Sequence, residues 1–312
     1  MQTSTSTSRF TAGSESGFSI VELMVTTVIL TAVSGVVMSG VMNMGQLNST
    51  VVNRTSMFAG VRNATALMEQ EVGQAGRVSL PAIVTLQGTV FADTTAAVAV
   101  TSADNMFVGE HLVIGAGERA ETVTLSAVDH DANTITATYL YNHNADEPVM
   151  ATGSFSSGVV PPTVANGSTD WVLKIFGDIN STGDMVYVEY TCDIATGRLY
   201  RNQMAWDVGE KEDPSVEQIL VDNVQPNPND APCFVYQTKT VNNVPFVVGV
   251  AITLTVQSQE KDPVTKEYQK ESKALLNVSP RNVFNAWQLA SLDIDNRVQP
   301  TPDEITELLP AN

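Results

Sequence analysis

The chain has 312 residues, of which 43% are hydrophobic and 16% charged, and this composition excludes an intrinsically disordered protein. The formal net charge is −18, and because residues 1–80 contain four Arg and four Glu, the whole acidic excess lies in residues 81–312. An acidic surface of this size repels phosphates, so we expect no nucleic-acid partner.

A polar segment, residues 1–17, precedes the run FSIVELMVTTVILTAVSGVVMSGVM, residues 18–42, in which the only charge is Glu22. As a helix this run is long enough to cross the roughly 30 Å of a bilayer's hydrocarbon. The small residue before a plausible cut, Gly17, lies ahead of the apolar run. Cleavage there removes only the leader, so we expect the apolar helix to remain as an anchor.

Glu22 is costly in such a helix, because a carboxylate near a membrane centre is unfavourable by about 2.5–3.5 kcal/mol. If the chain is cut after Gly17, Phe18 gains a free amino group that could pair with Glu22 of its own chain or of a neighbour. Alternatively, Glu22 lies at the interface and is hydrated. The residues by themselves leave both interpretations open.

The stretch Gly17 to Leu23, GFSIVEL, followed by this apolar run, resembles the type III signal of type IV pilins and type II secretion pseudopilins. The resemblance implies that prepilin peptidase cuts between Gly17 and Phe18 and that the amino group of Phe18 is methylated. It also implies that Glu22 neutralises the amino terminus of an adjacent subunit during assembly.

The helix is predicted to continue through residues 43–77 as an amphipathic segment, with Gly76 as its C-cap. The predicted apolar stripe consists of Val51, Phe58, Thr65 and Val72 at heptad spacing, with Val61, Met68 and Ala75 between them. The end of this segment, ATALMEQEVGQAGR, resembles the end of the long helix in PilW-like minor pilins and in related minor pseudopilins.

Residues 82–160 are predicted to form a small inserted β module, since HLVIGAG, AETVTLSAV and NTITATYL are typical of short strands separated by turns. The module loosely resembles those of phage tail fibres and bacterial surface proteins, which suggests adhesion; a decorating insertion with no ligand is the alternative. Its three histidines, His111, His130 and His143, lack metal-ligand spacing, and we expect ordinary surface or turn positions for them.

Gly153–Gly167 is predicted to be a linker, and residues 168–292 a head built on an antiparallel sheet. Alternating stretches near residues 171–176, 185–191 and 247–257 predict its strands, and Ser279–Leu292 predicts a short helix. Residues 293–312 are acidic and contain proline, so we expect a flexible tail.

Oxygen-bearing side chains at Asp178, Asn180, Asp184 and Glu189, with Gly183 at the sixth position, are spaced as in a calcium-binding loop. The flanks indicate strands and not helices, so we expect a hydrated turn and keep Asp178, Asn180 and Asp184 only as calcium candidates.

Cys192 and Cys233 are the only cysteines. In an exported chain they could form one disulfide, which would close a loop of about 40 residues. Two separate buried thiols are the alternative.

We therefore expect an α+β protein in which a long N-terminal transmembrane and amphipathic helix packs on an antiparallel β-sheet head, the pilin fold, with an inserted β module. The expected function is that of a PilW-like minor type IV pilin that helps to initiate pilus assembly. The alternatives are a minor pseudopilin of a type II secretion system and, in another class, a filament-carried adhesin.

No catalytic motif is present, so no enzymatic activity and no cofactor are expected. The expected partners are prepilin peptidase, the inner membrane, and other major and minor pilins or pseudopilins that contact the N-terminal helix. The head is expected in the periplasm and then on the pilus or cell surface.

Overall fold

The computed structural model describes residues 17, 19–211 and 218–308. The helices are α1 (Ile20–Gln74), α2 (Arg281–Ala290) and α3 (Asp303–Thr306). The strands are β1 (Val84–Thr85), β2 (Thr94–Ala99), β3 (His111–Ile114), β4 (Glu121–Asp129), β5 (Thr134–Tyr139), β6 (Pro148–Ala151), β7 (Ser154–Phe155), β8 (Val172–Gly177), β9 (Val186–Asp193), β10 (Arg198–Ala205), β11 (Ile219–Asp222), β12 (Val224–Gln225), β13 (Phe234–Val241), β14 (Val244–Gln257), β15 (Lys270–Val278) and β16 (Val298–Gln299).

Helix α1 is continuous over its 55 residues, as the apolar run and its amphipathic continuation predicted. Its last turn stops at Gly76, whose φ of +82° favours glycine. The buried side chains of the helix are Met57, Val61, Ala64, Thr65, Met68, Glu71 and Val72. The prediction was wrong for Val51 and Phe58, which are exposed, because a helix of 3.6 residues per turn drifts about 20° per heptad and rotates them off the stripe.

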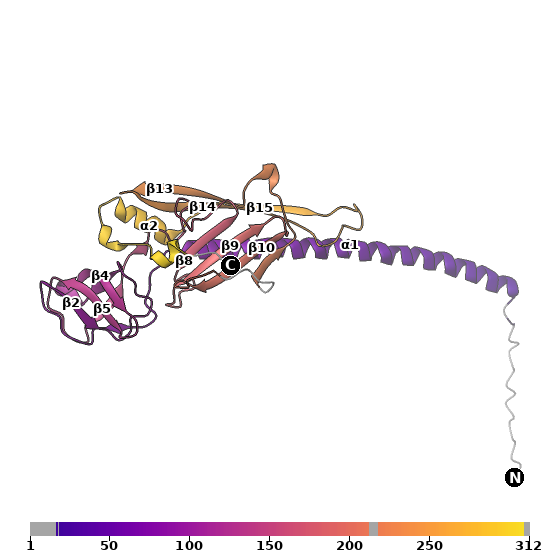
Figure 1. Cartoon of the computed structure of the whole chain (residues 1–312). Helices are drawn as coiled ribbons and strands as arrows, with labels where there is room; N and C mark the ends of the chain where they lie inside the picture. The colour runs from indigo at the N-terminus through magenta and orange to yellow at the C-terminus, as the bar shows by residue number, and fades with distance from the viewer. Residues whose placement is uncertain (1–16, 18, 212–217, 309–312) are drawn as a thin grey trace, which may run out of the picture. The chain divides into compact units, whose positions relative to one another are not determined.

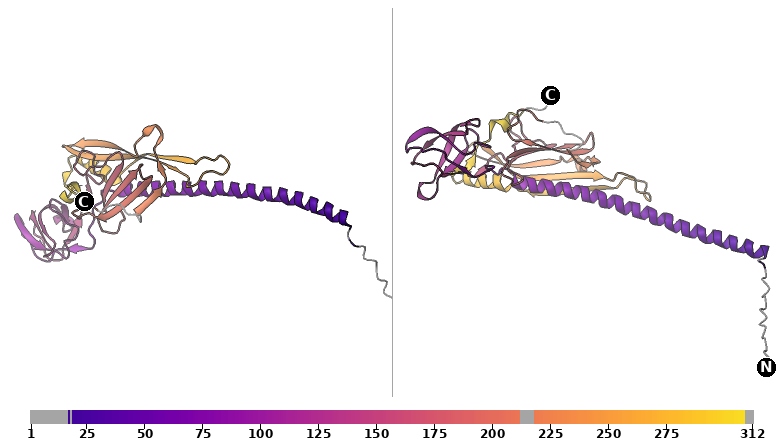
Figure 2. Two further views of the ribbon diagram at one scale, coloured as in Figure 1. Left: turned by 45° about the vertical axis from the view of Figure 1, so that its right-hand side comes forward. Right: turned by 90° about the horizontal axis from the view of Figure 1, so that it is seen from below.

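The head consists of two antiparallel sheets that curl over the second half of α1, with orders β11-β10-β9-β8 and β12-β14-β13, the latter extended by β15 on β14 (Figures 1 and 2). The predicted alternation of buried and partly exposed positions is found in parts of β8, β9 and β14, whereas residues 246–250 of β14 are all buried. A tight turn joins β13 to β14 through Asn242 and Asn243, both with positive φ, which asparagine tolerates better than most residues.

One apolar core joins the helix to both sheets. Its helical members include Val61, Met68 and Val72, and its sheet members include Ile175 and Ile252. Since side chains from both sheets meet the same helical stripe, burial of this stripe is what holds α1 to the head.

The predicted β module is a six-stranded antiparallel sheet of order β1-β6-β3-β4-β5-β2. A bridge between Leu86 and Val100 joins the two edges, with Gln87 N donating to Ala99 O at 2.7 Å, so the sheet closes on itself. The barrel encloses its own apolar core. The strands end at Ala151, earlier than the predicted boundary at residue 160.

The predicted linker Gly153–Gly167 is instead packed into the head. Phe155, Val159 and Val160 are fully buried, and Phe176 N donates to Gly158 O at 2.8 Å. A Cβ added to Gly158 would lie 2.2 Å from the Cα of Gly76. The small residues of this stretch thus permit close backbone packing, which a flexible linker does not need.

The prediction of a flexible tail over residues 293–312 is wrong for the part that the structure describes. Strand β16 pairs in parallel with β7, and Gln299 is fully buried. Ile305 and Leu308 pack in an apolar cluster with residues such as Phe155. The stretch was misjudged because its few apolar residues find partners that lie far away in the sequence.

Candidate functional site

The residues of the GFSIVEL motif lie at the start of α1. Gly17 precedes the helix and is exposed, Phe18 lies outside the described residues, and Glu22 is exposed in the first helical turn. Ser19 begins the helix, since its hydroxyl accepts a hydrogen bond from Val21 N at 3.3 Å and its carbonyl accepts one from Leu23 N at 3.0 Å. An acidic group so near the positive end of the helix dipole is favourably placed.

The N-terminal part of α1 presents apolar side chains on every face. The large hydrophobic residues from Ile20 to Val52 are each 53–79% exposed. Soluble monomers rarely expose apolar patches above a few hundred Å². The helix is long and apolar enough to cross a membrane, a property shared by membrane anchors and N-terminal signal sequences.

A buried charged group, Glu71, also joins the second half of α1 to the head. Glu71 is only 3% exposed. Arg201 on β10 donates two hydrogen bonds to its carboxylate, from Nη2 to Oε1 at 2.6 Å and from Nε to Oε2 at 3.1 Å. Tyr190 on β9 donates its hydroxyl to Oε2 of the same carboxylate. Burial and the adjacent Glu71 raise the pKa of Tyr190, so its phenol stays a donor. We call Glu71, Tyr190 and Arg201 the helix clamp.

The spacing of Glu71 gave a signal that could have revealed the clamp. It follows Met68 by three residues and Ala64 by seven, so it belongs to the buried stripe of α1. A carboxylate in such a stripe needs a cationic or hydrogen-bonding partner.

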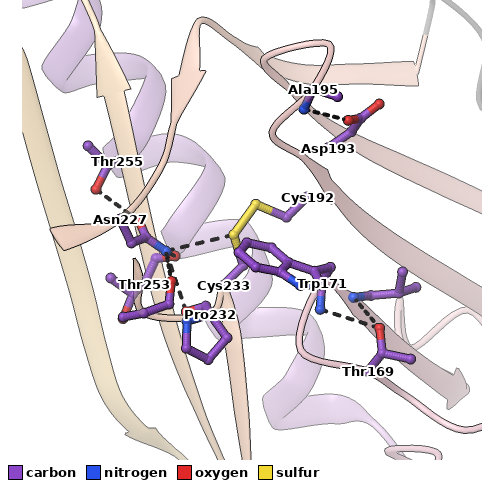
Figure 3. Close-up of a disulfide and its surroundings, with 12 residues drawn as sticks. Thr169, Trp171, Cys192, Asp193, Ala195, Asn227, Pro232, Cys233, Thr253 and Thr255 are labelled. Carbon is purple, nitrogen blue, oxygen red and sulfur yellow. Dashed lines mark hydrogen bonds between the residues drawn. A yellow bond between two sulfur atoms is a disulfide. The ribbon is translucent and has the colours of Figure 1, made fainter. Parts of the chain in front are cut away.

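The two cysteines form a disulfide, which settles the alternative left open by the sequence. Figure 3 shows the bridge with the indole of Trp171 beside it. Cys192 is in β9, and Cys233 immediately precedes β13, so the bond joins the two sheets of the head. Asn227 supports the bridge, because its Nδ2 donates to Thr253 O at 3.0 Å and lies 3.8 Å from the sulfur of Cys233.

Removing the disulfide is expected to destabilise the head by about 4 kcal/mol, the loop-closure entropy of a loop of this length. The test replaces Cys192 and Cys233 together by alanine and measures the free energy of unfolding by chemical denaturation. Adding reductant to the wild-type protein should reproduce the loss and leave the double variant unchanged. Equal stability of the wild type with and without reductant would contradict the prediction.

Of the three calcium candidates, only Asp178 is engaged through its side chain by protein groups in the described part of the chain. Asp178 is buried, lies 3.5 Å from Nε of Arg77, and accepts a hydrogen bond from Thr182 N at 2.9 Å. Asn180 and Asp184 are exposed. Glu189, at the twelfth position, lies in β9 and pairs with Lys211 at 2.8 Å. Asp178 thus stabilises the turn, and calcium binding by this loop stays an untested alternative.

The expectation of surface or turn positions is wrong for His143, which is fully buried between two carboxylates. Its Nε2 lies 2.8 Å from Glu121 Oε1 and its Nδ1 2.6 Å from Glu147 Oε2. Burial acts to raise the pKa of Glu147, but bonds from Asn144 and His143 outweigh burial and lower it. A neutral imidazole has one N–H, so which of the two carboxylates accepts a hydrogen bond from His143 depends on the tautomer.

The histidine network positions a loop of the barrel. Glu121 also accepts hydrogen bonds from the backbone N–H groups of Leu140 and Tyr141, at 2.8 and 3.1 Å. His111 and His130 are not part of this network, since His111 is half-buried in β3 and His130 is exposed after β4.

The structure defines an α+β protein with one long apolar N-terminal helix and antiparallel, curled sheets. No family model, curated protein or solved structure matches the chain. The residues of the chain itself are thus the basis for assigning its function.

Proposed function

We propose that this protein is a PilW-like minor type IV pilin, a structural and non-enzymatic subunit that helps to initiate pilus assembly. One observation carries the proposal: GFSIVEL lies at the start of a helix whose N-terminal part exposes apolar residues on all sides, while its second half is clamped into a β head. An exposed apolar helix requires lipid or other helices around it. Before assembly, the inner membrane supplies the lipid around the helix. In the filament, the helices of other subunits surround it.

In this function, prepilin peptidase cuts after Gly17 and releases a chain that starts at methylated Phe18. The new amino group lies four residues from Glu22 in sequence. In the filament, Glu22 pairs with the amino terminus of an adjacent pilin, which offsets a carboxylate cost of about 2.5–3.5 kcal/mol and fixes the register between neighbouring helices. Before assembly the head lies in the periplasm.

The test is intact-mass and N-terminal peptide analysis of the protein from membranes and from sheared surface filaments. The wild-type chain is expected to begin at methylated Phe18 and to be present in the sheared fraction. A chain beginning at Met1, in cells with active prepilin peptidase, would overturn the proposal. Maturation at Phe18 without any protein in the sheared fraction would favour a pseudopilin of a secretion system.

Glu22→Ala is expected to mature normally and to lose at least ~90% of its incorporation into filaments, because about 2–3 kcal/mol of lost pairing is a factor of tens in an equilibrium. Glu69→Ala is the matched control, since Glu69 is an exposed carboxylate on the same helix. Incorporation is measured by quantitative immunoblotting of the sheared fraction. Equal incorporation of both variants would remove the assigned role of Glu22.

A further inference from the structure

A cavity of about 530 Å³ lies where the barrel, strand β10 and the C-terminal segment meet. All its lining residues belong to the compact unit formed by residues 53–261 and 268–312. Its lining includes the apolar side chains Met106, Phe107 and Trp206, which we call the floor, and the carboxylates Asp207, Asp303 and Glu304, which we call the rim. Cavities of 300–1,000 Å³ at the meeting of two structural units are typical of ligand sites.

The floor side chains are buried, and the indole N–H of Trp206 is already hydrogen-bonded within the protein. Met106, Phe107 and Trp206 are 0%, 5% and 5% exposed. The ring of Phe107 lies 6.0 Å from Trp206, edge to face, and 5.7 Å from Phe155. Trp206 Nε1 donates to Asn105 Oδ1 at 3.3 Å. The indole N–H therefore needs no polar partner from a ligand.

A buried glutamine, Gln299, joins the C-terminal segment to the barrel. Gln299 Nε2 donates to His111 O at 2.7 Å and to Thr152 O at 2.6 Å, and its Oε1 accepts from His111 N at 2.9 Å. These bonds hold the C-terminal segment, and with it Asp303 and Glu304, against the barrel. The site is thus preorganised, which lowers the entropic cost of binding.

The rim is electrostatically uncompensated. Asp207, Asp303 and Glu304 are exposed, and among the described residues no ion pair joins any of them to a cation. Three carboxylates at the mouth of a hollow with an apolar floor focus a negative potential in it. The complementary ligand is a cation carried on an apolar body.

We propose that this cavity binds an arginine or lysine side chain on a basic segment of a partner protein. The alkyl stem covers the floor, while the cationic head meets the rim and the face of Trp206. Arginine suits the site best, because its planar group stacks on aromatic rings and pairs with carboxylates through two bonds. The proposal is independent of the pilin assignment and holds for any partner with such a segment.

The test uses the full-length protein in a non-ionic detergent and a fluorescein-labelled acetyl-Gly-Leu-Arg-Leu-Gly-amide peptide, with binding followed by fluorescence anisotropy. Saturable binding is expected. Replacing the arginine by the neutral isostere citrulline should weaken binding ~10-fold or more, the equivalent of one lost charge-assisted contact. Raising the salt from about 50 to about 500 mM should weaken it several-fold, because the Debye length shortens.

Two triple variants, each of which removes three negative charges, test whether the peptide binds at the rim. Asp207→Asn, Asp303→Asn and Glu304→Gln together should weaken peptide binding ~10-fold or more. The control combines Asp93→Asn, Glu118→Gln and Asp146→Asn, three exposed carboxylates elsewhere on the barrel, and should bind as the wild type does. If the rim triple variant fails to fold, as judged by circular dichroism, Asp207→Asn and Glu304→Gln are measured singly, with ~3-fold losses expected.

Three results would overturn the proposal: no saturable binding at millimolar peptide, equal binding of the citrulline peptide, or equal losses in the rim and control variants. Free arginine amide that binds as tightly as the peptide would show that the site takes a small amine and not a protein segment. None of these results bears on maturation at Phe18, so the pilin proposal is tested separately.

Discussion

Arg201→Met is expected to lower the free energy of unfolding of the head by about 3–5 kcal/mol, because it leaves the buried carboxylate of Glu71 without its cation. Glu71 Oε1 and Arg201 Nη2 are 2.6 Å apart, and the carboxylate is only 4% exposed. Little water can reach this carboxylate to replace the lost partner. The measurement is chemical denaturation of the detergent-solubilised protein, followed by circular dichroism.

A second ion pair on the same strand provides the control for the helix clamp. Arg198 lies 3.2 Å from Asp222, but the two side chains are 40% and 56% exposed. Arg198→Met should therefore cost less than ~1 kcal/mol. Equal losses for Arg198→Met and Arg201→Met would show that the clamp has no special role.

The double variant Glu71→Leu with Arg201→Met should recover most of the stability lost in Arg201→Met, since a well-packed apolar pair often replaces a buried ion pair without loss. Tyr190 then loses its acceptor, so we expect recovery to within about 1–2 kcal/mol of the wild type. No recovery would mean that Arg201 stabilises the head by packing and not through Glu71.

Glu110→Gln is expected to stabilise the protein at alkaline pH and to leave it unchanged near pH 4.5. Glu110 is fully buried before β3, and burial raises the pKa of its carboxyl from 4.5 to about 8 against a weak backbone hydrogen bond from Phe107 N at 3.4 Å. Its Oε1 has no hydrogen-bond partner among the described residues.

The sign of the effect follows from proton binding. Between pH 4.5 and about 8 the folded protein keeps the proton of Glu110, while the unfolded chain releases it. The stability that the proton on Glu110 contributes is therefore fully present below pH 4.5. It falls by about 1.4 kcal/mol per pH unit as the pH rises from 4.5 to about 8, for a total of roughly 4–5 kcal/mol.

The measured quantity is the difference in unfolding free energy between wild type and Glu110→Gln across this pH range. Subtraction removes the contribution of the other titrating groups, because both proteins share them. The matched control is Glu118→Gln, an exposed carboxyl in the same barrel, which should give a difference independent of pH. A flat difference for Glu110→Gln as well would mean that this carboxyl is hydrated in the folded protein.

Local patterns predicted the elements whose form depends on neighbours in the sequence. The apolar run and the heptad stripe predicted α1, and alternation predicted β8, β9 and β14. A turn with Gly197, which has a φ of +69°, separates β9 from β10. The motif around Gly17 and Glu22 is likewise local, so the candidate processing site could be read directly from seven consecutive residues.

Features that depend on distant partners could not be predicted in this way. Glu71 and Arg201 are 130 residues apart, and Glu121 and His143 belong to different segments of the barrel. In each case the residue type suggested that a partner is needed, but the neighbouring residues in the sequence did not indicate which distant residue the partner is. The packing of Phe155 against the C-terminal segment was missed for the same reason, since small and polar residues surround it.

The way the barrel is connected to the head has a consequence for the history of this protein. Phe155 N donates to Gly76 O at 2.9 Å, and Arg77 bridges Ser154, so the chain leaves the head and returns to it at adjacent points. The head's own hydrogen bonds bring these points together, and the intervening length of chain is free to vary. Because the two ends of the barrel meet at adjacent points of the head, the length of the barrel can change during evolution at little entropic cost to the head.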